Sequence, residues 1–319
     1  MATKKSAKSK APGDKTKRAT RKETAPPAEV RQEQSKVFPV VGIGASAGGL
    51  EAFRELLENL PTDTGMAFVL VQRLDPDHES ILTELLSKST RLPVSEVSEG
   101  VAVEPDHVYV IPPNTNMIIK QGAMRLLPRE DVRGQLRPID FFLRSLAEEQ
   151  SNRAIGVILS GTASDGTLGL EAIKAEGGIT FAQDEKTAKY DGMPRSAVAA
   201  GCVDFVLQPH RIAKEIARIA RHPYVAAAEV VEYEEARPAG EARLVGDSFS
   251  RILQLLRRAT GTDFSKYKPS TLRRRITRRL ALRKLDGMDE YLEYLGDHQD
   301  EVERLYKKAK ESPSLPVRG

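Results

Sequence analysis

The stretch VVGIGASAGGL, residues 40–50, decides the fold of the larger part of this chain. An apolar run, a glycine turn and then apolar side chains at helical spacing predict a strand, a tight turn and the start of a helix. Ser46 lies in the turn. There it is close to the backbone N–H groups of a helix N-terminus, which can bind a developing oxyanion. The stretch therefore offers both parts of an acyl-transfer site.

Three interpretations of this stretch compete. Residues 44–48 fit the G-x-S-x-G nucleophile elbow, and residues 42–47 fit a relaxed dinucleotide fingerprint. The fingerprint also requires an acidic residue about 20 positions further on, but the strand predicted over 66–72 is followed by Arg73, and the next carboxylate is Asp75. Nucleotide binding is therefore disfavoured. In the third interpretation the glycines only allow a helix to pack on a sheet.

Length and composition limit the class of protein. The chain has 319 residues, 40% of them hydrophobic, which suffices for about two domains with real cores. It has no apolar run of about 18 residues and no signal sequence at its start, so we expect a soluble, cytoplasmic protein without membrane insertion. Cys202 is the one cysteine, which excludes an intrachain disulfide and a multi-cysteine zinc site. We expect a buried core thiol there, and neither a metal nor another cofactor.

Charge and composition divide the chain into segments. Residues 1–36 carry 11 Lys and Arg against 4 Asp and Glu, whereas residues 251–284 carry 12 against 1. The first segment has almost no apolar content and is predicted to be a disordered basic tail. Nucleic acid is not the expected partner of this tail, because no aromatic residue is interleaved for base stacking. The predicted order is then an α/β domain over 37–222, an acidic linker over 223–244, a helical domain over 245–310 and a tail over 311–319.

Short apolar strands alternate with helices from residue 38 to residue 222. This alternation predicts a mostly parallel, doubly wound sheet with helices on both faces, and the closely spaced runs over 107–127 predict an inserted antiparallel hairpin. Functional loops of such a sheet lie at the carboxyl ends of its strands. Three such loops contain Ser46, Arg73 and Asp165. They have the layout of a nucleophile, a middle position and an orienting carboxylate, in a chain order that ordinary α/β-hydrolases do not have.

Four motifs give this domain a specific resemblance. In chain order they are GIGASAGG, VLVQRLDPDH, VILSGTASDGTLGL and FAQDEKTAKYDGMPRSAVAAGCVDFVLQP. Together they resemble the catalytic domain of the chemotaxis methylesterase CheB, over about residues 37–222. The resemblance implies a hydrolase of signal transduction, a protein-glutamate methylesterase and protein-glutamine deamidase. Such an enzyme cleaves glutamyl methyl esters of methyl-accepting chemoreceptors through an acyl-serine intermediate.

The resemblance also assigns roles to single residues. Ser46 takes the place of the serine nucleophile and Asp165 that of the triad aspartate. Ala47, Gly48 and Thr162 take the oxyanion and loop positions. Thr162 stands where the family has a methionine whose backbone helps to form the oxyanion hole, a change that a backbone donor tolerates.

The position of the triad histidine differs from the family. This chain has Arg73 where the family has histidine after its second strand. A guanidinium stays protonated and has no acceptor lone pair, so Arg73 cannot take the serine proton. We therefore expect impaired turnover. His78, in the same loop, is a candidate substitute base, although the hybrid proteins named below carry a histidine there as well as the usual one.

The helical segment carries a second resemblance. RRATGTDFSKYKPSTLRRRITRRLALRKLDGMDEYLEYL, residues 257–295, resembles the N-terminal helical domain of the receptor methyltransferase CheR, whose basic helix docks near the anionic methylation sites of chemoreceptors. The order of the two domains resembles CheB/CheR hybrid proteins, here truncated at the C-terminus. No glycine-rich strand-turn-helix motif follows Tyr306, so we expect no methyl transfer.

An alternative function is a catalytically weak binding module. In this alternative the chain docks on acidic receptor or partner helices through a patch of arginines between residues 273 and 283. A solvated helix face is the competing interpretation of the same residues, and RNA is the rival partner. The arginines expected to bind the partner are Arg273, Arg274, Arg275, Arg278 and Arg279.

Overall fold

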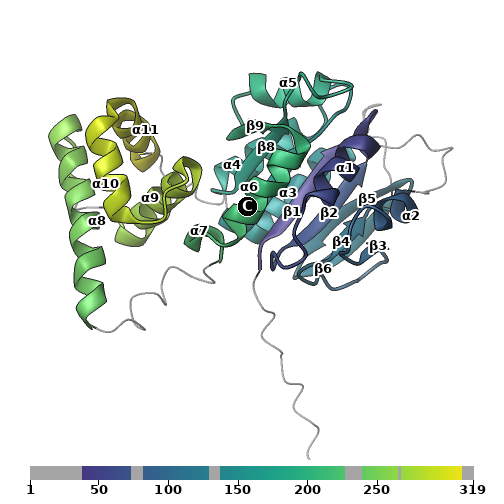
Figure 1. The fold of residues 1–319 in the computed structure, drawn as a ribbon, viewed down its shortest axis with the longest axis horizontal. Helices are drawn as coiled ribbons and strands as arrows, with labels where there is room; N and C mark the ends of the chain where they lie inside the picture. Colours follow the sequence, from purple (N-terminus) through teal and green to yellow (C-terminus); the bar gives the residue numbers. More distant parts are fainter. Residues whose placement is uncertain (1–37, 73–81, 129–136, 227–238, 265–266, 311–319) are drawn as a thin grey trace, which may run out of the picture. The chain divides into compact units, whose positions relative to one another are not determined.

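The structure is a computed structural model (Figure 1). It describes residues 38–72, 82–128, 137–226, 239–264 and 267–310, with residues 239–247 described as backbone only. The predicted basic tail, Arg73, His78, most of the predicted linker and the last nine residues lie outside the described part. Within these ranges, none of the helices combines the length and the apolar character needed to cross a lipid bilayer.

Seven strands form one parallel sheet (Figure 1). They are β1 (Val40–Ala45), β2 (Ala67–Gln72), β3 (Val94–Glu96), β4 (Val108–Val110), β7 (Ala154–Ile158), β8 (Ile179–Gln183) and β9 (Phe205–Leu207). Their order across the sheet is β3-β4-β2-β1-β7-β8-β9, and every pairing is parallel. All residues of β1 are buried, because this central strand has neighbours on both sides and helices on both faces. The predicted mostly parallel sheet is confirmed.

A separate antiparallel pair consists of β5 (Thr115–Lys120) and β6 (Ala123–Pro128). The predicted hairpin is therefore confirmed for these two strands but wrong for β4, which pairs in parallel with β2 and β3. A short apolar strand such as β4 has the same residue pattern in a parallel and in an antiparallel sheet. Its closeness in sequence to β5 therefore led to the wrong prediction of a hairpin strand. β3 was not predicted, because three residues are too few to show a period.

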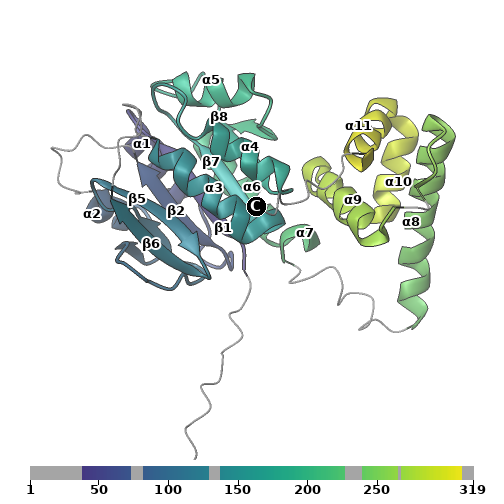
Figure 2. The same cartoon turned by 180° about the vertical axis from the view of Figure 1, so that it is seen from behind.

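Helices cover both faces of the sheet (Figures 1 and 2). Those of this domain are α1 (Gly49–Glu58), α2 (Leu82–Ser87), α3 (Pro138–Gln150), the 3-10 turn η1 (Ser151–Arg153), α4 (Thr167–Ala175), α5 (Gly192–Ala199), α6 (Pro209–Ala220) and α7 (Pro223–Ala226). On one face, Val41 and Ile43 of β1 share a core with Phe53 of α1 and Ile212 of α6. On the other face, Val40 shares a core with α3 and α4. The alternation of side chains along β1 thus divides the interior into two layers.

The glycines of β1 allow α3 to lie directly on the strand. A Cβ added to Gly42 would lie 2.6 Å from Leu143, and one added to Gly44 would lie 2.3 Å from Ile139. Neither neighbour has room to retreat, because both are fully buried. These glycines therefore serve helix packing, as the third interpretation of the stretch proposed.

Four further helices pack around a core of their own, which confirms the predicted helical segment after the sheet. They are α8 (Ala239–Thr260), α9 (Pro269–Arg283), α10 (Met288–Asp297) and α11 (Gln299–Lys310). Ile252 and Leu256 of α8 meet Ile276 of α9, Tyr291 of α10 and Leu305 of α11 in this core. Each of these side chains is at most 1% exposed.

A single carboxylate organises the polar part of the helical core. Glu301 is fully buried and accepts hydrogen bonds from Arg279 Nε at 2.7 Å, Arg283 Nε at 2.8 Å and Tyr291 Oη at 2.9 Å. Burial acts to raise the pKa of Glu301, but the hydrogen bonds from Arg279 and Arg283 outweigh it, and the pKa lies below its ordinary value of 4.5. The carboxylate is therefore charged at neutral pH and ties three helices together.

We predict that Glu301→Gln lowers the free energy of unfolding by about 3 kcal/mol at pH 7, because it leaves the half-buried guanidinium groups of Arg279 and Arg283 without their shared, fully buried anion. Urea denaturation of the full chain measures the change. The difference between wild type and variant should be complete above the unfolded pKa of a glutamate. It should shrink as the pH falls through the lowered folded pKa, because the wild type then loses the same charge.

Glu303→Gln is the matched control, since Glu303 lies on the same helix and is exposed. Its effect should stay within about 0.5 kcal/mol. Equal effects of the two substitutions would show that the buried carboxylate does not hold the helical core together.

Candidate active site

The two loops that hold Ser46 and Asp165 lie at a topological switch point of the sheet. Neighbouring strands β1 and β7 lead into helices on opposite faces, because α1 packs in the core of Phe53 and α4 packs in the core of Leu170. In open α/β sheets, ligands bind beyond the carboxyl ends of strands whose connections diverge in this way. The fold therefore places both predicted residues where a substrate is expected.

The loop of Ser46 is fastened to the loop that follows β7. The N–H of Ser46 donates to the carbonyl oxygen of Ser160 at 3.0 Å, and the carbonyl oxygen of Ser46 accepts from the N–H of Gly49 at 2.9 Å. The Ser160 hydroxyl donates to the carbonyl oxygen of Ala47 at 3.0 Å. Gly48 has a φ of 70°, and a Cβ there would lie 2.8 Å from Ser160 Oγ. Hydrogen bonds of its own backbone thus fix the position of Ser46.

Gly161 brings the second loop directly against Ser46. A Cβ at Gly161 would lie 3.0 Å from the Cβ of Ser46 and 2.1 Å from the Sδ of Met193. The loop is held in this place by two backbone bonds of 2.9 Å, from Gly161 N–H to Tyr190 and from Met193 N–H to Gly161. A side chain at position 161 would collide with Met193 and press on Ser46, so this glycine is required by close approach.

The predicted oxyanion positions flank Ser46 on the two loops. Ala47 and Thr162 are exposed and Gly48 is half-buried. Ala163, next to Thr162, has a φ of 65°. A residue other than glycine adopts that left-handed conformation at a cost of about 1 kcal/mol. Strain of this kind is typical of loops that present backbone groups to a ligand.

Asp165 is held by the N-terminus of α3. It is 2% exposed and accepts hydrogen bonds from the N–H groups of Asp140 at 2.9 Å and Ile139 at 3.3 Å. In return, the side chain of Asp140 accepts from the N–H of Gly169 at 2.9 Å, in the first turn of α4. Asp165, in the loop before α4, thus caps the N-terminus of α3, and Asp140 of α3 caps the N-terminus of α4. Both carboxylates lie at the positive ends of helix dipoles.

Asp140 was not among the predicted site residues. Its only sequence signal is an acidic residue in the first turn of a predicted helix, which is a common feature of helices. The structure assigns it a specific task, because the loop that carries Asp165 cannot shift without breaking the bonds that join α3 and α4. We regard Asp140 as a positioning residue of the site.

The middle position of the predicted triad and the candidate substitute base fall outside the described residues. β2 ends at Gln72, which pairs with Ala45 at the end of β1. Arg73 follows Gln72 in the sequence, and both Arg73 and His78 lie outside the described part. The structure therefore brings together the loops of Ser46 and Asp165, while the roles of Arg73 and His78 stay predictions.

The arginines of α9 contact other parts of the chain. Arg278 is 8% exposed and donates to the carbonyl oxygens of Gly177 at 3.0 Å and Gly178 at 2.8 Å, and to Asp204 Oδ2 at 2.7 Å. Arg279 binds Glu301 as described above. Arg273, Arg274, Arg275 and Arg279 are all half-buried. Arg275 donates to the carbonyl oxygen of Ala309 at 2.7 Å, and the guanidinium carbon of Arg273 lies 4.4 Å from the centre of the Phe249 ring.

Cys202 is a buried thiol, as predicted. Its Sγ donates to the carbonyl oxygen of Ala197 at 3.2 Å. Burial raises the pKa of Cys202 to about 11, so the sulfur carries its proton at neutral pH. A protonated thiol in an apolar layer is a poor nucleophile.

Comparison with known proteins places this geometry in a family. Residues 41–216 match the family model of the CheB methylesterase, and residues 247–308 match that of the all-alpha domain of the CheR methyltransferase. An uncharacterized 104.1 kDa protein of Rhodobacter capsulatus is 35% identical over 71% of this chain and 25% of its own length. A protein-glutamate methylesterase/protein-glutamine glutaminase of Burkholderia lata is 39% identical over 57% of this chain and 54% of its own length. The chain thus spans between a quarter and about half of the length of these relatives.

A solved structure gives the same assignment. The crystal structure of the Thermotoga maritima CheB methylesterase catalytic domain covers 57% of this chain and 98% of its own length, with a TM-score of 0.53 and 31% sequence identity. Because the first family model spans more than half of the residues, the chain belongs to the CheB methylesterase family and carries a CheR-type all-alpha domain after its methylesterase domain.

Proposed function

We propose that the α/β domain hydrolyses glutamyl methyl esters, and deamidates glutamine, on a chemoreceptor or a similar signalling protein. The observation that carries the proposal is the attachment of Ser46 to the loop of Ser160 and Gly161, which also leads to the buried Asp165. Family membership supports the same chemistry. The action on a receptor and the cytoplasmic location remain parts of the proposal.

The proposed reaction proceeds in two steps. Ser46 Oγ attacks the ester carbonyl carbon, and backbone N–H groups of the two flanking loops stabilise the oxyanion. The tetrahedral intermediate expels the alkoxy group, which takes a proton and leaves as methanol, and an acyl-serine remains. Water then attacks the acyl-serine, a glutamate is released, and Ser46 regains its proton. Both steps need a group that takes and returns a proton.

Arg73 is the weak point of this mechanism. A guanidinium cannot accept the proton of Ser46, so the proton must pass to water or to His78. Loss of one triad member in a serine hydrolase costs on the order of 10⁶ in turnover and leaves about 10³ over the uncatalysed reaction. The proposed esterase is therefore slow unless His78 takes over as base.

The competing function is a binding module with little turnover. The chemistry of Arg73 favours it, but the arginines of α9 support it less than the sequence suggested. Arg278 and Arg279 have acceptors inside the chain, and a guanidinium that leaves such partners for a ligand loses hydrogen bonds that it already has. We therefore place esterase chemistry first.

We predict that methanol release from a methylated receptor fragment depends on Ser46. The assay compares wild type with Ser46→Ala, Arg73→His and His78→Ala, and uses Ser87→Ala as control because Ser87 is an exposed serine at the end of α2. Wild-type turnover that both Ser46→Ala and His78→Ala abolish would establish a relocated base. A silent wild type that Arg73→His restores by several orders of magnitude would establish an assembled site that lacks only its base.

Two results would contradict the proposed function. One is turnover that survives Ser46→Ala at the level of Ser87→Ala. The other is the absence of methanol release from both wild type and Arg73→His, provided that both proteins unfold at the same urea concentration as Ser87→Ala. The first result would assign the turnover to a group other than Ser46, and the second would leave the fold with binding alone.

We predict a second, separable effect at Asp140. Asp140→Ala should lower the free energy of unfolding by about 1 kcal/mol through loss of the cap on α4. It should also lower kcat, with KM unchanged, because the side-chain bond that joins α3 to α4 is lost and the loop that carries Asp165 is held less firmly, although the N–H of residue 140 still donates to Asp165. Asp140→Asn should recover part of the lost kcat, since an amide oxygen still accepts a hydrogen bond from Gly169. The measurements use the more active of wild type and Arg73→His.

Glu149→Ala is the matched control for Asp140→Ala. Glu149 lies at the other end of α3 and accepts from the N–H of Gly122 at 2.8 Å. Its loss should cost stability without changing kcat. If kcat falls equally in both variants, Asp140 acts on the fold and not on the site.

A further inference from the structure

The turn that holds Ser46 contains two backbone donors that are open to a ligand. Its ends are joined, because the carbonyl oxygen of Ser46 accepts from the N–H of Gly49 at 2.9 Å. Within the part of the chain that the structure describes, the N–H groups of Ala47 and Gly48 between them have no acceptor. Such donors beside a nucleophile can stabilise negative charge on a substrate oxygen. Their direction therefore matters for the chemistry at Ser46.

Two forms of this turn are open to the backbone. Gly48 has a φ of 70° and a ψ of 9°, and Ala47 has a negative φ, which together define a type II turn. A type I turn joins the same ends with its central peptide turned over. Glycine adopts the conformations of both forms without a steric penalty. The backbone alone therefore does not fix the direction of the peptide between Ala47 and Gly48.

The hydroxyl of Ser160 holds this peptide in the type II form. Ser160 is 1% exposed, and its Oγ accepts from the N–H of Tyr190 at 3.0 Å. Because a backbone N–H can only donate, the hydroxyl proton remains for a carbonyl oxygen. Two carbonyl oxygens are within reach, that of Ala47 at 3.0 Å and that of Tyr190 at 3.3 Å. The shorter distance assigns the proton to Ala47.

The bond to Ala47 also sets the direction of the next N–H. In a planar trans peptide the C=O and N–H groups point to opposite sides. With the carbonyl oxygen of Ala47 held at Ser160, the N–H of Gly48 points away from Ser160. A peptide turned over to the type I form would present the carbonyl oxygen there instead. A developing oxyanion would then meet a partial negative charge in place of a donor.

Ser160 is itself held by neighbouring parts of the sheet. Its N–H donates to Gln183 Oε1 at 2.8 Å, and Gln183, at the end of β8, is 2% exposed. Its carbonyl oxygen accepts from the N–H of Ser46. Ser160 thus joins the turn of Ser46, the end of β7 and the loop that carries Tyr190. A hydroxyl fixed in this way can hold a peptide without moving during a reaction.

We propose that Ser160 is a positioning residue of the site. Its hydroxyl holds the peptide between Ala47 and Gly48 in the orientation that keeps the N–H of Gly48 open to the oxyanion. Ser160 acts through this peptide and does not touch the reacting atoms. The proposal rests on the proposed esterase function, because it assigns a role within that reaction.

The first test measures methanol release by Ser160→Ala in the more active of wild type and Arg73→His. We expect kcat to fall about tenfold to a hundredfold with KM unchanged, because a donor that meets the oxyanion contributes only in the transition state. Ser160→Thr keeps a hydroxyl and should retain most of kcat. If Ser160→Ala does not fold, Ser160→Cys replaces it, since a thiol is a weaker donor than a hydroxyl.

Thr180→Val is the matched control. The Thr180 hydroxyl is fully buried, accepts from the N–H of Asp204 at 3.1 Å and donates to the carbonyl oxygen of Cys202 at 2.7 Å. It therefore makes the same two kinds of bond as Ser160, but near the amino end of β8. Its loss should lower the free energy of unfolding and leave kcat unchanged.

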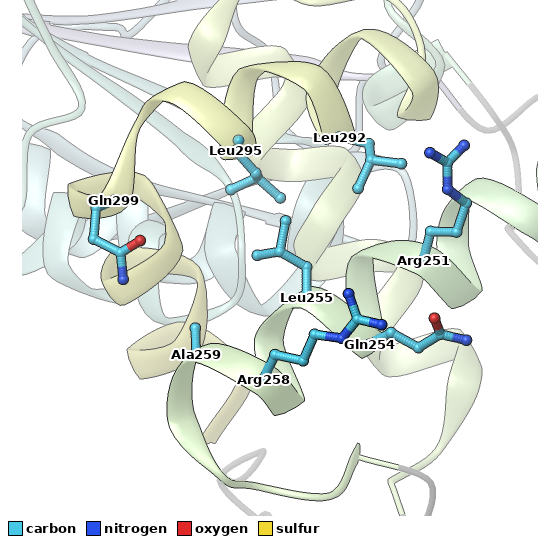
Figure 3. Close-up of a pocket in the computed structure, with 9 residues that line it drawn as sticks. Arg251, Gln254, Leu255, Arg258, Ala259, Leu292, Leu295 and Gln299 are labelled. Atoms are coloured by element: carbon cyan, nitrogen blue, oxygen red, sulfur yellow. The ribbon is translucent and has the colours of Figure 1, made fainter.

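A groove in the helical segment supplies a remote control. It has a volume of about 510 Å³ and lies between α8 and α10, where Leu255 points toward Leu292 and Leu295 (Figure 3). The described residues that line it include none from the loops around Ser46. Leu292→Ala should therefore change stability without changing kcat.

The second test observes the peptide directly and does not need turnover. The full chain is labelled with alanine that carries ¹³C at its carbonyl carbon and with ¹⁵N-glycine. Three Ala–Gly peptides, at residues 47–48, 200–201 and 239–240, then give peaks in a carbonyl–amide NMR correlation spectrum. Ala200→Ser and Ala239→Ser each remove one peak and so assign all three. Ser160→Ala should shift the 47–48 peak by more than Thr180→Val does, because the carbonyl group of Ala47 loses its hydrogen bond.

Three results would overturn the proposal. Unchanged kcat in Ser160→Ala, in a protein whose turnover requires Ser46, would do so and leave the esterase function intact. Equal losses of kcat in Ser160→Ala and Thr180→Val would show a general effect of lost stability. A 47–48 peak that Ser160→Ala does not shift would show that the hydroxyl does not hold the peptide. If no variant turns over, the esterase function fails, and the position of this peak alone decides whether Ser160 holds the turn.

Discussion

The contact of α3 with the bare backbone of β1 is the constraint on which the site depends. A Cβ atom at Gly44 would come within 2.3 Å of Ile139 Cγ2, and one at Gly166 within 2.9 Å of the same atom. Both positions are glycine, so the N-terminus of α3 can reach the edge of the sheet at which β1 and β7 end. Only there can its first N–H groups bind Asp165. Packing in the apolar layer thus decides where a polar group of the site stands.

Much of this arrangement could be predicted from residue patterns. Apolar runs of strand length, each followed by a helical period, predict parallel strands with crossing helices, and the loops at their carboxyl ends follow from that topology. Ser46 and Asp165 are found at two neighbouring strand ends for this reason. The errors occurred where the pattern was shortest: β3 was missed, and β4 was assigned to a hairpin. A strand of three residues fits several topologies equally well.

The polar network around Asp165 could not be predicted in the same way. Asp140 and Gly169 lie 29 positions apart in the sequence, and their hydrogen bond exists only because α3 and α4 begin side by side. Local rules indicate that a helix N-terminus needs a cap, but they do not say which carboxylate provides it when the two helices exchange caps. Sequence reasoning therefore found the acidic residue that family motifs mark and missed the one that holds it.

The same argument explains the dense arginines of the helical segment. Arg275 donates to the carbonyl oxygen of Ala309 in the last turn of α11, and Arg278 donates to those of Gly177 and Gly178 just after α4. Arg218 of α6 donates in the same way to the carbonyl oxygen of Ala281 in the last turn of α9. The last carbonyl groups of a helix have no partner within it and lie at the negative end of its dipole, so a guanidinium satisfies both needs at once. A run of basic residues in a sequence can therefore supply donors to carbonyl groups within the chain, or it can bind an acidic partner. Exposure, which the sequence does not show, separates the two.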